Sequence, residues 1–320
     1  MNFWNDLVRP FFILAPMEGV TDIVFRDVIA HACPPDVFFT EFTNVSSFAS
    51  EKGRKNTLTR LVPSKDVPTV AQIWGKNLED YPITASALDD LGFAGVDINM
   101  GCPDRHVIKA GGGSDFIRHP DRAVEAIRLT KSATNLPVSI KTRLGYTFPD
   151  EFREWLPVIL AEKPAALTVH LRTKKEMSKV PAHYEFIPEI CELRNNISPE
   201  TKLIINGDIK SREAAQNQEP EVDGFMIGRG VFENPYCFSS HRPTANELLR
   251  LFLYHLDLFD RRKIKLEEQG EKYPFEPLKH FYKVYIKDFS GANQLRQRLM
   301  SCTNTAELRD TIYQEFSELK

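Results

Sequence analysis

Short apolar runs recur along the chain as far as residue 227, and each is followed by a longer segment with helical spacing. Several runs, such as Leu203–Ile205, are apolar at consecutive positions, which is typical of strands covered on both faces in a parallel sheet. Amphipathic spacing between the runs predicts helices, most clearly over Leu78–Leu91 and Asp121–Ala133. The predicted strands are Phe11–Met17, Val37–Phe42, Thr69–Trp74, Gly95–Met100, Pro137–Leu144, Ala166–Leu171, Lys202–Asn206 and Gly224–Ile227.

Strict alternation of strands and helices predicts a parallel sheet with right-handed crossovers. Eight such units in about 235 residues match the (β/α)8 TIM barrel, whose typical size is about 250 residues. The competing fold, a doubly wound open sheet, would carry a glycine fingerprint after its first strand. The first strand instead ends in Ala15–Gly19, which is no such fingerprint, so the α/β barrel is favoured.

Strand-like runs stop near Phe238, and only helical patterns follow. Turn-forming residues separate these patterns, which predicts a small bundle of antiparallel helices. The sequence therefore predicts two domains, a catalytic barrel over residues 1–240 and a helical domain over residues 241–320. The predicted helices of the second domain are Glu247–Leu266, Glu276–Phe289, Ala292–Ser301 and Thr305–Leu319.

The composition is that of a soluble globular protein, with 42% hydrophobic and 27% charged residues among 320. The apolar run Phe11–Ala15 is far shorter than the ~18 residues that a membrane span needs, and it lacks a small-residue cleavage pattern. The five cysteines are odd in number and widely scattered, which argues against a disulfide framework and against a zinc site. We therefore expect a cytoplasmic protein without a membrane segment or a metal ion.

Polar and cationic residues gather at the predicted carboxyl ends of the strands, which is where barrels place their functional groups. Each of these strand ends has a plain structural explanation when it is taken alone. Their convergence from many strands predicts one site at one mouth of the barrel. The residues concerned are Pro16, Met17, Glu18, Gln72, Asn99, Cys102, Lys141, Arg143, His170, Arg172, Asn206, Gly207, Asp208, Gly228 and Arg229.

Glycine-containing loops follow the last two predicted strands, at Asn206–Asp208 and at Gly228–Gly230. Barrels often hold a phosphate on backbone N–H groups at these two loops. The alternative is that both are tight turns in which only glycine fits. Phosphate binding is the favoured interpretation, with Arg229 adding a positive charge.

Lys141 and Arg143 lie two residues apart on one strand, so their side chains share a face. Two cations inside a barrel mouth require an anionic or electron-rich partner, because a buried unpaired charge is costly. The alternative is an internal ion pair with Asp97 or Asp208. His170, at the end of the next strand, is either a hydrogen-bonded core histidine or a ligand-binding group.

Cys102 lies in a loop directly after a predicted strand, three residues beyond Asn99. A loop cysteine beside a substrate pocket can act as a nucleophile or as a proton donor. Apart from His106, no histidine lies near Cys102 in the sequence to form an activated Cys–His pair. A neutral thiol that donates a proton is therefore favoured over a thiolate. The alternative, a small buried thiol, is the interpretation preferred for Cys33, Cys191, Cys237 and Cys302.

These strand ends resemble, in order, the motifs of the flavin-dependent tRNA-dihydrouridine synthases. The resemblance covers residues 11–236, and the ordered set is far more specific than any one piece. The family architecture, an FMN-binding barrel followed by a small helical domain, agrees with the boundary predicted above. The matching segments are Leu14–Asp22, Asn99–Pro103, Val107–Ser114, Lys141–Arg143, His170–Thr173, Asn206–Ile209 and Gly228–Gly230.

The resemblance implies a role for each strand end. It implies that FMN accepts electrons from NADPH and passes a hydride to C6 of a uracil, while Cys102 protonates C5 on the opposite face. The target base must leave the tRNA stack to reach the pocket. The cofactor-binding residues that it implies are Pro16, Met17, Gln72, Lys141, His170, Asn206, Gly207, Asp208, Gly228 and Arg229. The uracil-binding residues that it implies are Asn99, Arg143 and Arg172.

The chain departs from the family in two places. After Arg172-Thr173 the family often has a glutamine and a glycine, whereas this chain has the lysine-rich stretch Lys174–Tyr184. That loop borders the substrate side, so the departure bears on which uridine is chosen rather than on the reaction. Ser114 replaces a common alanine, and we expect little effect from it.

The overall charge of −3 does not indicate a nucleic-acid partner, but its distribution is uneven. Residues 241–320 carry 14 Lys+Arg and 12 Asp+Glu, a net +2, whereas the remaining residues carry 27 and 32, a net −5. A solvated lysine face is the usual explanation of such residues. With the family resemblance, tRNA contact is favoured, and a monomer is expected. The predicted tRNA contacts are a stripe of Lys279, Lys283 and Lys287 and a patch of Lys174, Lys175 and Lys179.

Two other functions fit parts of the sequence. An FMN barrel that acts on a free pyrimidine, as dihydroorotate dehydrogenases do, would not need the helical domain. A catalytically silent tRNA-binding protein on this fold would not need Cys102, Lys141 and His170 together. The tRNA-dihydrouridine synthase is therefore the favoured function.

Overall fold

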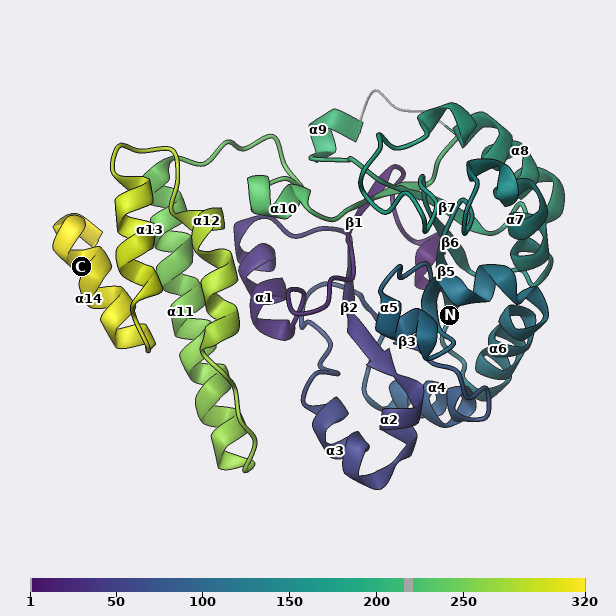
Figure 1. Ribbon diagram of the computed structural model, residues 1–320, viewed down its shortest axis with the longest axis horizontal. Coiled ribbons are helices and arrows are strands. Elements are labelled where there is room, and N and C mark those ends of the chain that lie inside the picture. Colours follow the sequence, from purple (N-terminus) through teal and green to yellow (C-terminus); the bar gives the residue numbers. More distant parts are fainter. Residues whose placement is uncertain (1, 216–220, 320) are drawn as a thin grey trace.

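The protein is described here by a computed structural model, which covers residues 2–215 and 221–319. Eight parallel strands form a closed barrel in which each strand pairs with the next and β8 pairs with β1 (Figure 1). The predicted (β/α)8 barrel is therefore confirmed. The strands are β1 (Phe11–Leu14), β2 (Val37–Asn44), β3 (Thr69–Trp74), β4 (Gly95–Met100), β5 (Val138–Arg143), β6 (Ala166–His170), β7 (Lys202–Asn206) and β8 (Gly224–Ile227).

Helices surround the barrel and connect its strands (Figure 1). The two helices with the clearest amphipathic patterns, α4 and α6, lie where the sequence places them. The helices of the barrel are α1 (Ile23–Ala32), α2 (Val45–Ala49), α3 (Glu51–Leu58), α4 (Asp80–Asp90), α5 (Arg105–Lys109), α6 (Pro120–Ala133), α7 (Phe152–Ala161), α8 (Ile187–Ile197), α9 (Arg212–Ala215) and α10 (Gly230–Glu233). Short 3-10 helices add η1 (Phe3–Asn5), η2 (Gly113–Arg118), η3 (Pro149–Glu151) and η4 (Tyr184–Phe186).

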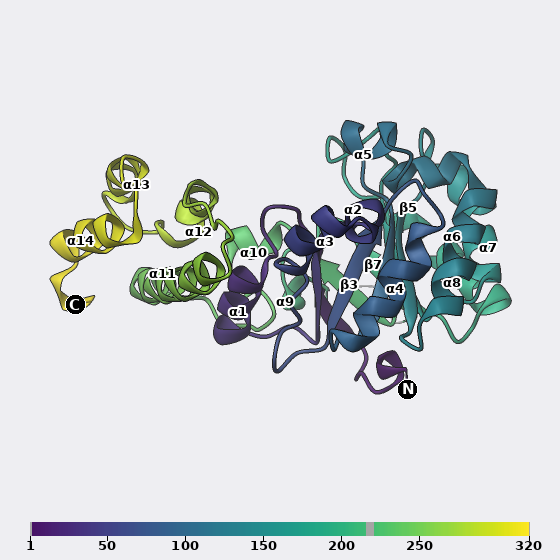
Figure 2. The same cartoon turned by 90° about the horizontal axis from the view of Figure 1, so that it is seen from below.

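Apolar side chains fill the amino-terminal half of the barrel interior. Alternate residues of β1 face opposite sides, so Phe11 and Ile13 belong to the inner cluster while Phe12 and Leu14 pack toward the helices. Trp4 on η1 closes this cluster, with its ring centroid 5.8 Å from that of Phe11. Figure 2 shows the N-terminal segment at the end of the barrel opposite α5, which follows a strand's carboxyl end. This apolar cluster therefore closes the amino-terminal end of the barrel interior.

Beyond β8, the described residues form helices and no strand. The longest helix, α11, begins with a capping box in which Thr244 and Glu247 satisfy each other's backbone N–H groups. It packs against α1 of the barrel, as both views show (Figures 1 and 2). The elements of this part are α11 (Ala245–Glu268), η5 (Glu276–Phe281), α12 (Tyr282–Tyr285), α13 (Ala292–Met300), α14 (Thr305–Glu315) and η6 (Ser317–Leu319).

The prediction of a single helix over Glu276–Phe289 is wrong. The segment starts as the 3-10 helix η5, continues for one turn as α12 and ends before Asp288, which has a left-handed φ of 65°. A 3-10 helix has three residues per turn, so a four-residue spacing does not keep side chains on one face.

The lysine stripe expected on that helix is therefore not formed. Lys279 Nζ donates to Met300 O at 3.1 Å and pairs with Glu276 at 3.1 Å. Lys287 Nζ donates to the backbone carbonyl of Glu233, and both lysines are half-buried. Lys283 alone of the three is exposed.

The helical part shares its apolar core with the barrel. Phe25 on α1 is fully buried, and its ring centroid lies 4.7 Å from that of Phe281 on η5. On the same interface, His31 stacks on Tyr254 with centroids 4.1 Å apart. Because the core is continuous, the two parts stabilise each other.

We expect Phe25→Ala to lower the free energy of unfolding by about 3–5 kcal/mol, because it removes a buried ring from this shared core. Phe148→Ala, in which an exposed ring is removed, is the matched control and should change it by no more than about 0.5 kcal/mol. Urea unfolding followed by circular dichroism measures both values. Equal effects of the two substitutions would contradict the shared core.

Candidate active site

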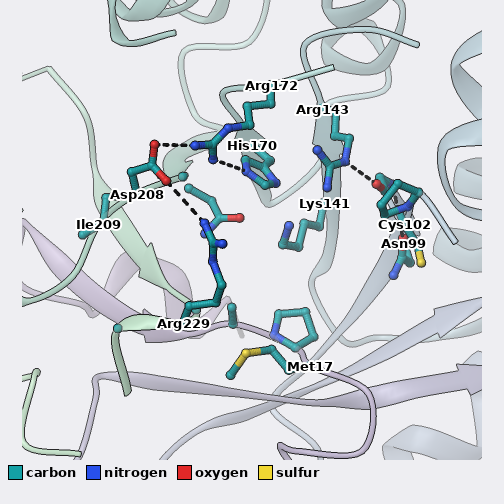
Figure 3. Close-up of a pocket in the computed structure, with 18 of the residues that line it drawn as sticks. Met17, Asn99, Cys102, Lys141, Arg143, His170, Arg172, Asp208, Ile209 and Arg229 are labelled. Carbon is teal, nitrogen blue, oxygen red and sulfur yellow. Dashed lines mark hydrogen bonds and ion pairs between the residues drawn. The ribbon is translucent and has the colours of Figure 1, made fainter. Parts of the chain in front are cut away.

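A cavity of about 410 Å³ opens at the carboxyl ends of the strands (Figure 3). Every cofactor- and uracil-binding residue that the sequence predicts, and Cys102, lines this cavity. The structure also places Phe42, Ile209, Lys210 and Glu233 in its wall, and the sequence reasoning missed these four. Phe42 lies within β2, Ile209 and Lys210 follow the loop after β7, and Glu233 lies on α10. Whether these side chains reach the cavity depends on tertiary packing, which no local pattern predicts.

Lys141 points into the middle of the cavity from β5 (Figure 3). Its ammonium group has no hydrogen bond or ion pair with any described residue. Burial lowers its pKa to about 8, the positive charge of Arg143 adds to the shift, and Asp97 opposes it. The expected alternative, an internal ion pair with Asp97 or Asp208, is not formed by the described atoms. Lys141 is therefore available to an anionic ligand.

Arg143 on the same strand is buried without a carboxylate in hydrogen-bond contact. Its Nε donates to Gly101 O at 2.7 Å, and its Nη1 donates to Thr173 O at 3.1 Å and to Met177 O at 3.3 Å. Arg143 thus ties the loop after β4 to the loop after β6. Its Nη2 has no partner among the described residues. Because Arg143 lines the cavity, this group is available as a donor for a ligand.

Asp208 forms ion pairs with two further arginines. Its carboxylate accepts from Arg172, from Arg229 at 3.5 Å and from the Ala182 backbone N–H at 2.9 Å (Figure 3). Burial opposes ionisation, but the Arg172 and Ala182 hydrogen bonds prevail and hold the pKa of Asp208 below its ordinary value. The Asp208 side chain is therefore occupied by cations, so this residue can reach an anionic cofactor through its backbone N–H.

His170 is neutral in this site. Burial, together with the surrounding positive charges, lowers its pKa well below the ordinary value. Arg172 Nη1 lies 3.3 Å from His170 Nε2, and because a guanidinium can only donate, Nε2 is the acceptor. The ring proton is thereby assigned to Nδ1, which leaves His170 as a neutral donor at the cavity wall.

The loops after β7 and β8 form a cradle of backbone donors. The N–H groups of Gly207, Asp208, Gly228 and Arg229 donate to no described residue. Gly207 has a φ of 128°, and a Cβ there would lie 3.2 Å from the His170 ring. Unpaired N–H groups beside Arg229 suit a phosphate group, as the glycine loops predict. A phosphorylated cofactor fits this wall.

Cys102 lies at the rim of the cavity, and its backbone is held from Asn99. Asn99 Oδ1 accepts from the N–H of Cys102 at 2.9 Å and from that of Gly101 at 3.2 Å. Burial raises the pKa of the Cys102 thiol, although Arg143 and Lys141 oppose the shift. A thiol whose pKa is raised keeps its proton at neutral pH, which is what a proton donor requires; that role of Cys102 stays a prediction.

The lysine-rich loop after β6 is anchored at this rim. Glu176 accepts from the Thr173 N–H at 2.7 Å and contacts His183 Nε2 at 2.9 Å. Lys174 Nζ lies 4.8 Å from the centre of the Tyr146 ring. Lys175 and Lys179 are exposed. The loop thus presents two solvated cations next to the cavity.

The described residues contain no helix long and apolar enough to cross a membrane, and no cluster of ligands suited to a metal ion. The barrel, its cationic cavity and the cradle after β7 and β8 place the chain among the TIM-barrel enzymes that bind a phosphorylated ligand at the carboxyl ends of the strands.

The dihydrouridine synthase (Dus) family model matches residues 13–319. A probable tRNA-dihydrouridine synthase 2 of Bacillus subtilis (strain 168) is 48% identical over 313 residues, which are 96% of this chain and 94% of that protein. A probable tRNA-dihydrouridine synthase of Staphylococcus aureus (strain N315) has the same identity and coverage. The chain belongs to the dihydrouridine synthase family and is an oxidoreductase.

Solved structures agree with the fold. Histamine dehydrogenase from Rhizobium sp. 4-9 has a TM-score of 0.54 at 13% identity, covering 78% of this chain and 49% of that chain. A 2-naphthoyl-CoA reductase complex also has a TM-score of 0.54, at 11% identity, covering 74% of this chain and 50% of that chain. At these identities the likeness concerns the barrel fold alone.

We expect Lys141→Met to raise the unfolding temperature of the flavin-free protein at pH 7 by a few degrees. Wild-type Lys141 is charged at that pH and carries the cost of burial without a partner, and the substitution removes the cost. The gain should shrink as the pH rises through about 8, where folded wild-type Lys141 loses its proton.

Thermal unfolding at pH 7 and about pH 9.5, above the folded pKa of Lys141, measures this difference. Lys163→Met, at an exposed position, is the control and should show no such pH dependence. A Lys141→Met protein less stable than wild type at both pH values would contradict the unpaired charge.

Proposed function

We propose that this member of the dihydrouridine synthase family reduces the C5–C6 bond of specific uridines in tRNA to 5,6-dihydrouridine, with FMN as cofactor and NADPH as electron donor. The observation that carries the proposal is the position of Cys102 at a cavity whose cations and free N–H groups suit FMN. Burial raises the pKa of its thiol, which suits a proton donor. The names of the Bacillus and Staphylococcus relatives support tRNA as the substrate. They favour it over a free pyrimidine or a silent binding role.

FMN would be held at three parts of the cavity wall. Pro16 and Met17 offer an apolar surface for the ring system, and Gln72 and Lys141 offer polar groups for its edge. The unpaired Lys141 ammonium would balance negative charge on the ring, which is how proteins commonly tune a flavin. The phosphate would take the N–H groups of the cradle, Asn206 would line it, and His170 would donate from Nδ1.

When bound, FMN supplies from N5 the hydride that adds to C6 of the uracil. The chain's own residues supply the proton and the orientation of the base. Cys102 donates its thiol proton to C5, and the nearby Arg143 and Lys141 charges stabilise the thiolate that remains. Asn99 and Arg143 each keep an N–H for uracil oxygens, because their hydrogen bonds within the protein leave donors over. Arg172, also expected at the uracil, is occupied by Val180 O and Asp208 and acts by holding this wall.

Binding to tRNA would use exposed cations around the cavity. Lys175 and Lys179 lie on the loop after β6, with Lys174 half-buried beside them, and Lys283 lies on α12. We assign residues 1–240 to a catalytic domain and residues 241–320 to a tRNA-binding domain with a net charge of +2. The target uridine would flip out of the tRNA stack to enter the cavity. We place this reaction in the cytoplasm and assign it to a monomer.

We expect Cys102→Ala to abolish dihydrouridine formation, with a loss of at least about 100-fold, because general acids contribute that much or more. The bound flavin should remain at wild-type level. Mass spectrometry of tRNA from a strain lacking dihydrouridine synthases, complemented with each variant, measures the product. Cys33→Ala, which changes a half-buried cysteine at the carboxyl end of α1, is the control. Dihydrouridine at wild-type level with Cys102→Ala would contradict the proton donor.

We expect the double change Lys175→Glu with Lys179→Glu to weaken tRNA binding about tenfold or more at physiological salt, and to flatten its salt dependence, because fewer counterions are released. FMN binding should not change. Lys65→Glu with Lys163→Glu, exposed at the amino ends of the strands, is the charge-matched control. Filter binding across a salt series measures the effect, and equal losses in both variants would exclude a local contact.

A further inference from the structure

A second cavity, of about 590 Å³, opens beside the active-site cavity at the carboxyl ends of β2 and β3. Phe42 and Cys102 line both cavities, so the two meet at the residue proposed as the proton donor. Figure 3 shows Cys102 on the side of the active-site cavity opposite Asp208 and Arg229. The second cavity therefore continues the site on the side away from the phosphate cradle.

Trp74, the last residue of β3, gives the second cavity an aromatic wall. The indole rests on Gly112, where a Cβ would lie 2.8 Å from the ring carbon Cε3, so a larger residue there would displace the ring. Trp74 is half-buried, and its Nε1 donates to no described residue. An indole that is supported in this way offers a surface on which a planar base can stack.

Two asparagine amides line the same cavity. Asn44 is the register partner of Trp74 on the adjacent strand, so these two residues lie side by side. Asn44 Oδ1 accepts from the Ser47 N–H at 2.9 Å and caps α2, which leaves Nδ2 without a described partner. Asn56 on α3 is exposed, and its amide forms no hydrogen bond with a described residue. Such amide groups suit the polar edges of an unpaired base.

The charges around the second cavity do not suit a phosphate. Arg60 is the one cation among the described residues that line it, and its guanidinium is paired with Glu18 and, at 3.1 Å, with Glu41. Asp104 adds a further negative charge and caps α5 through Oδ1. A phosphate here would meet carboxylates and no free cation, which argues against the phosphates of NADPH. An uncharged, planar part of a nucleotide fits this wall.

The proposed reaction brings a polynucleotide to this place. The target uracil has to lie against Cys102 for its C5 to receive the thiol proton, and the nucleotides on either side are covalently attached to it. Flipping of the uridine breaks its stacking on these neighbours. A neighbouring base beside Cys102 therefore has an uncovered face, and the second cavity is within its reach.

We propose that the second cavity is a subsite for the base that adjoins the target uridine, stacked on Trp74 and hydrogen-bonded by the amides of Asn44 and Asn56. The inference rests on the proposed function and deepens it, because it adds recognition of the neighbouring nucleotide to recognition of the uracil. The choice of uridine then depends on the base beside it.

Trp74→Leu removes the stacking surface, and Trp74→Phe keeps an aromatic ring in its place. We expect Trp74→Leu to weaken tRNA binding about tenfold in filter binding, because a stacked base contributes about that much, and Trp74→Phe to weaken it less. Asn44→Ser keeps an oxygen that can cap α2 but removes the free amide, and it should weaken binding about threefold. The FMN content of the three variants should stay at the wild-type level.

The matched control is Asn135→Ser, which removes an exposed amide from the segment that precedes β5, and it should bind tRNA as wild type does. The decisive probe is a series of tRNAs, each with one abasic nucleotide at an unpaired position. At one position we expect wild type to bind about tenfold more weakly than it binds intact tRNA, and Trp74→Leu to show no further loss. The stacked base is then missing from either the RNA or the protein, so the two losses do not add.

This position should adjoin the uridine that mass spectrometry identifies as reduced. Additive losses at every position, or a coupled position that is not next to that uridine, would overturn the subsite. A raised KM for NADPH with unchanged tRNA affinity in Trp74→Leu would assign the cavity to the electron donor and overturn it as well. If the FMN-loaded wild type formed no dihydrouridine, the proposed function would be wrong, whereas the abasic series would still decide whether Trp74 stacks on a base of the tRNA.

Discussion

An excess of buried positive charge at the carboxyl end of the barrel is the constraint on which the site depends. Lys141, Arg143 and Arg172 converge there with the more exposed Arg229, and among the described residues Asp208 alone forms an ion pair with any of them. Such an arrangement is costly in an empty pocket and becomes favourable when an anion enters. Burial, together with the same excess of positive charge, lowers the pKa of His170 and keeps it neutral. The cofactor is therefore part of the electrostatic balance of the fold.

The rest of the molecule makes this charge excess tolerable. The apolar cluster around Trp4 and Phe11 excludes water from the other end of the barrel, so the polar layer has one opening. Backbone carbonyls of Gly101 and Thr173 hold Arg143 in place of a carboxylate. The helical part adds a second support, since α11 and η5 extend the core beyond α1. The stability that these regions contribute offsets the cost of the unpaired charges at the site.

Much of the fold and site could be predicted because the relevant signals are local. β3, β4, β7 and β8 have the predicted bounds, since consecutive apolar residues mark strands that are covered on both faces. The strand-end residues meet because parallel strands bring their carboxyl ends to one mouth. The prediction for the segment after Glu276 was wrong for the opposite reason: its periodicity is helical, but packing of Tyr282 and Tyr285 under α11 and the left-handed Asp288 shorten it.

The sequence by itself determined the barrel, the mouth at which the chemistry gathers and the family, because periodicity and ordered motifs are properties of the chain. The tertiary structure alone decided the partners of each charged group. Asp97 and Asp208 were equal candidates to neutralise Lys141 and Arg143, yet Asp97 accepts from Gln72 and Ser139 while Asp208 holds Arg172 and Arg229. Hydrogen bonds depend on distances of a few tenths of an ångström between residues far apart in sequence, and no local pattern encodes them.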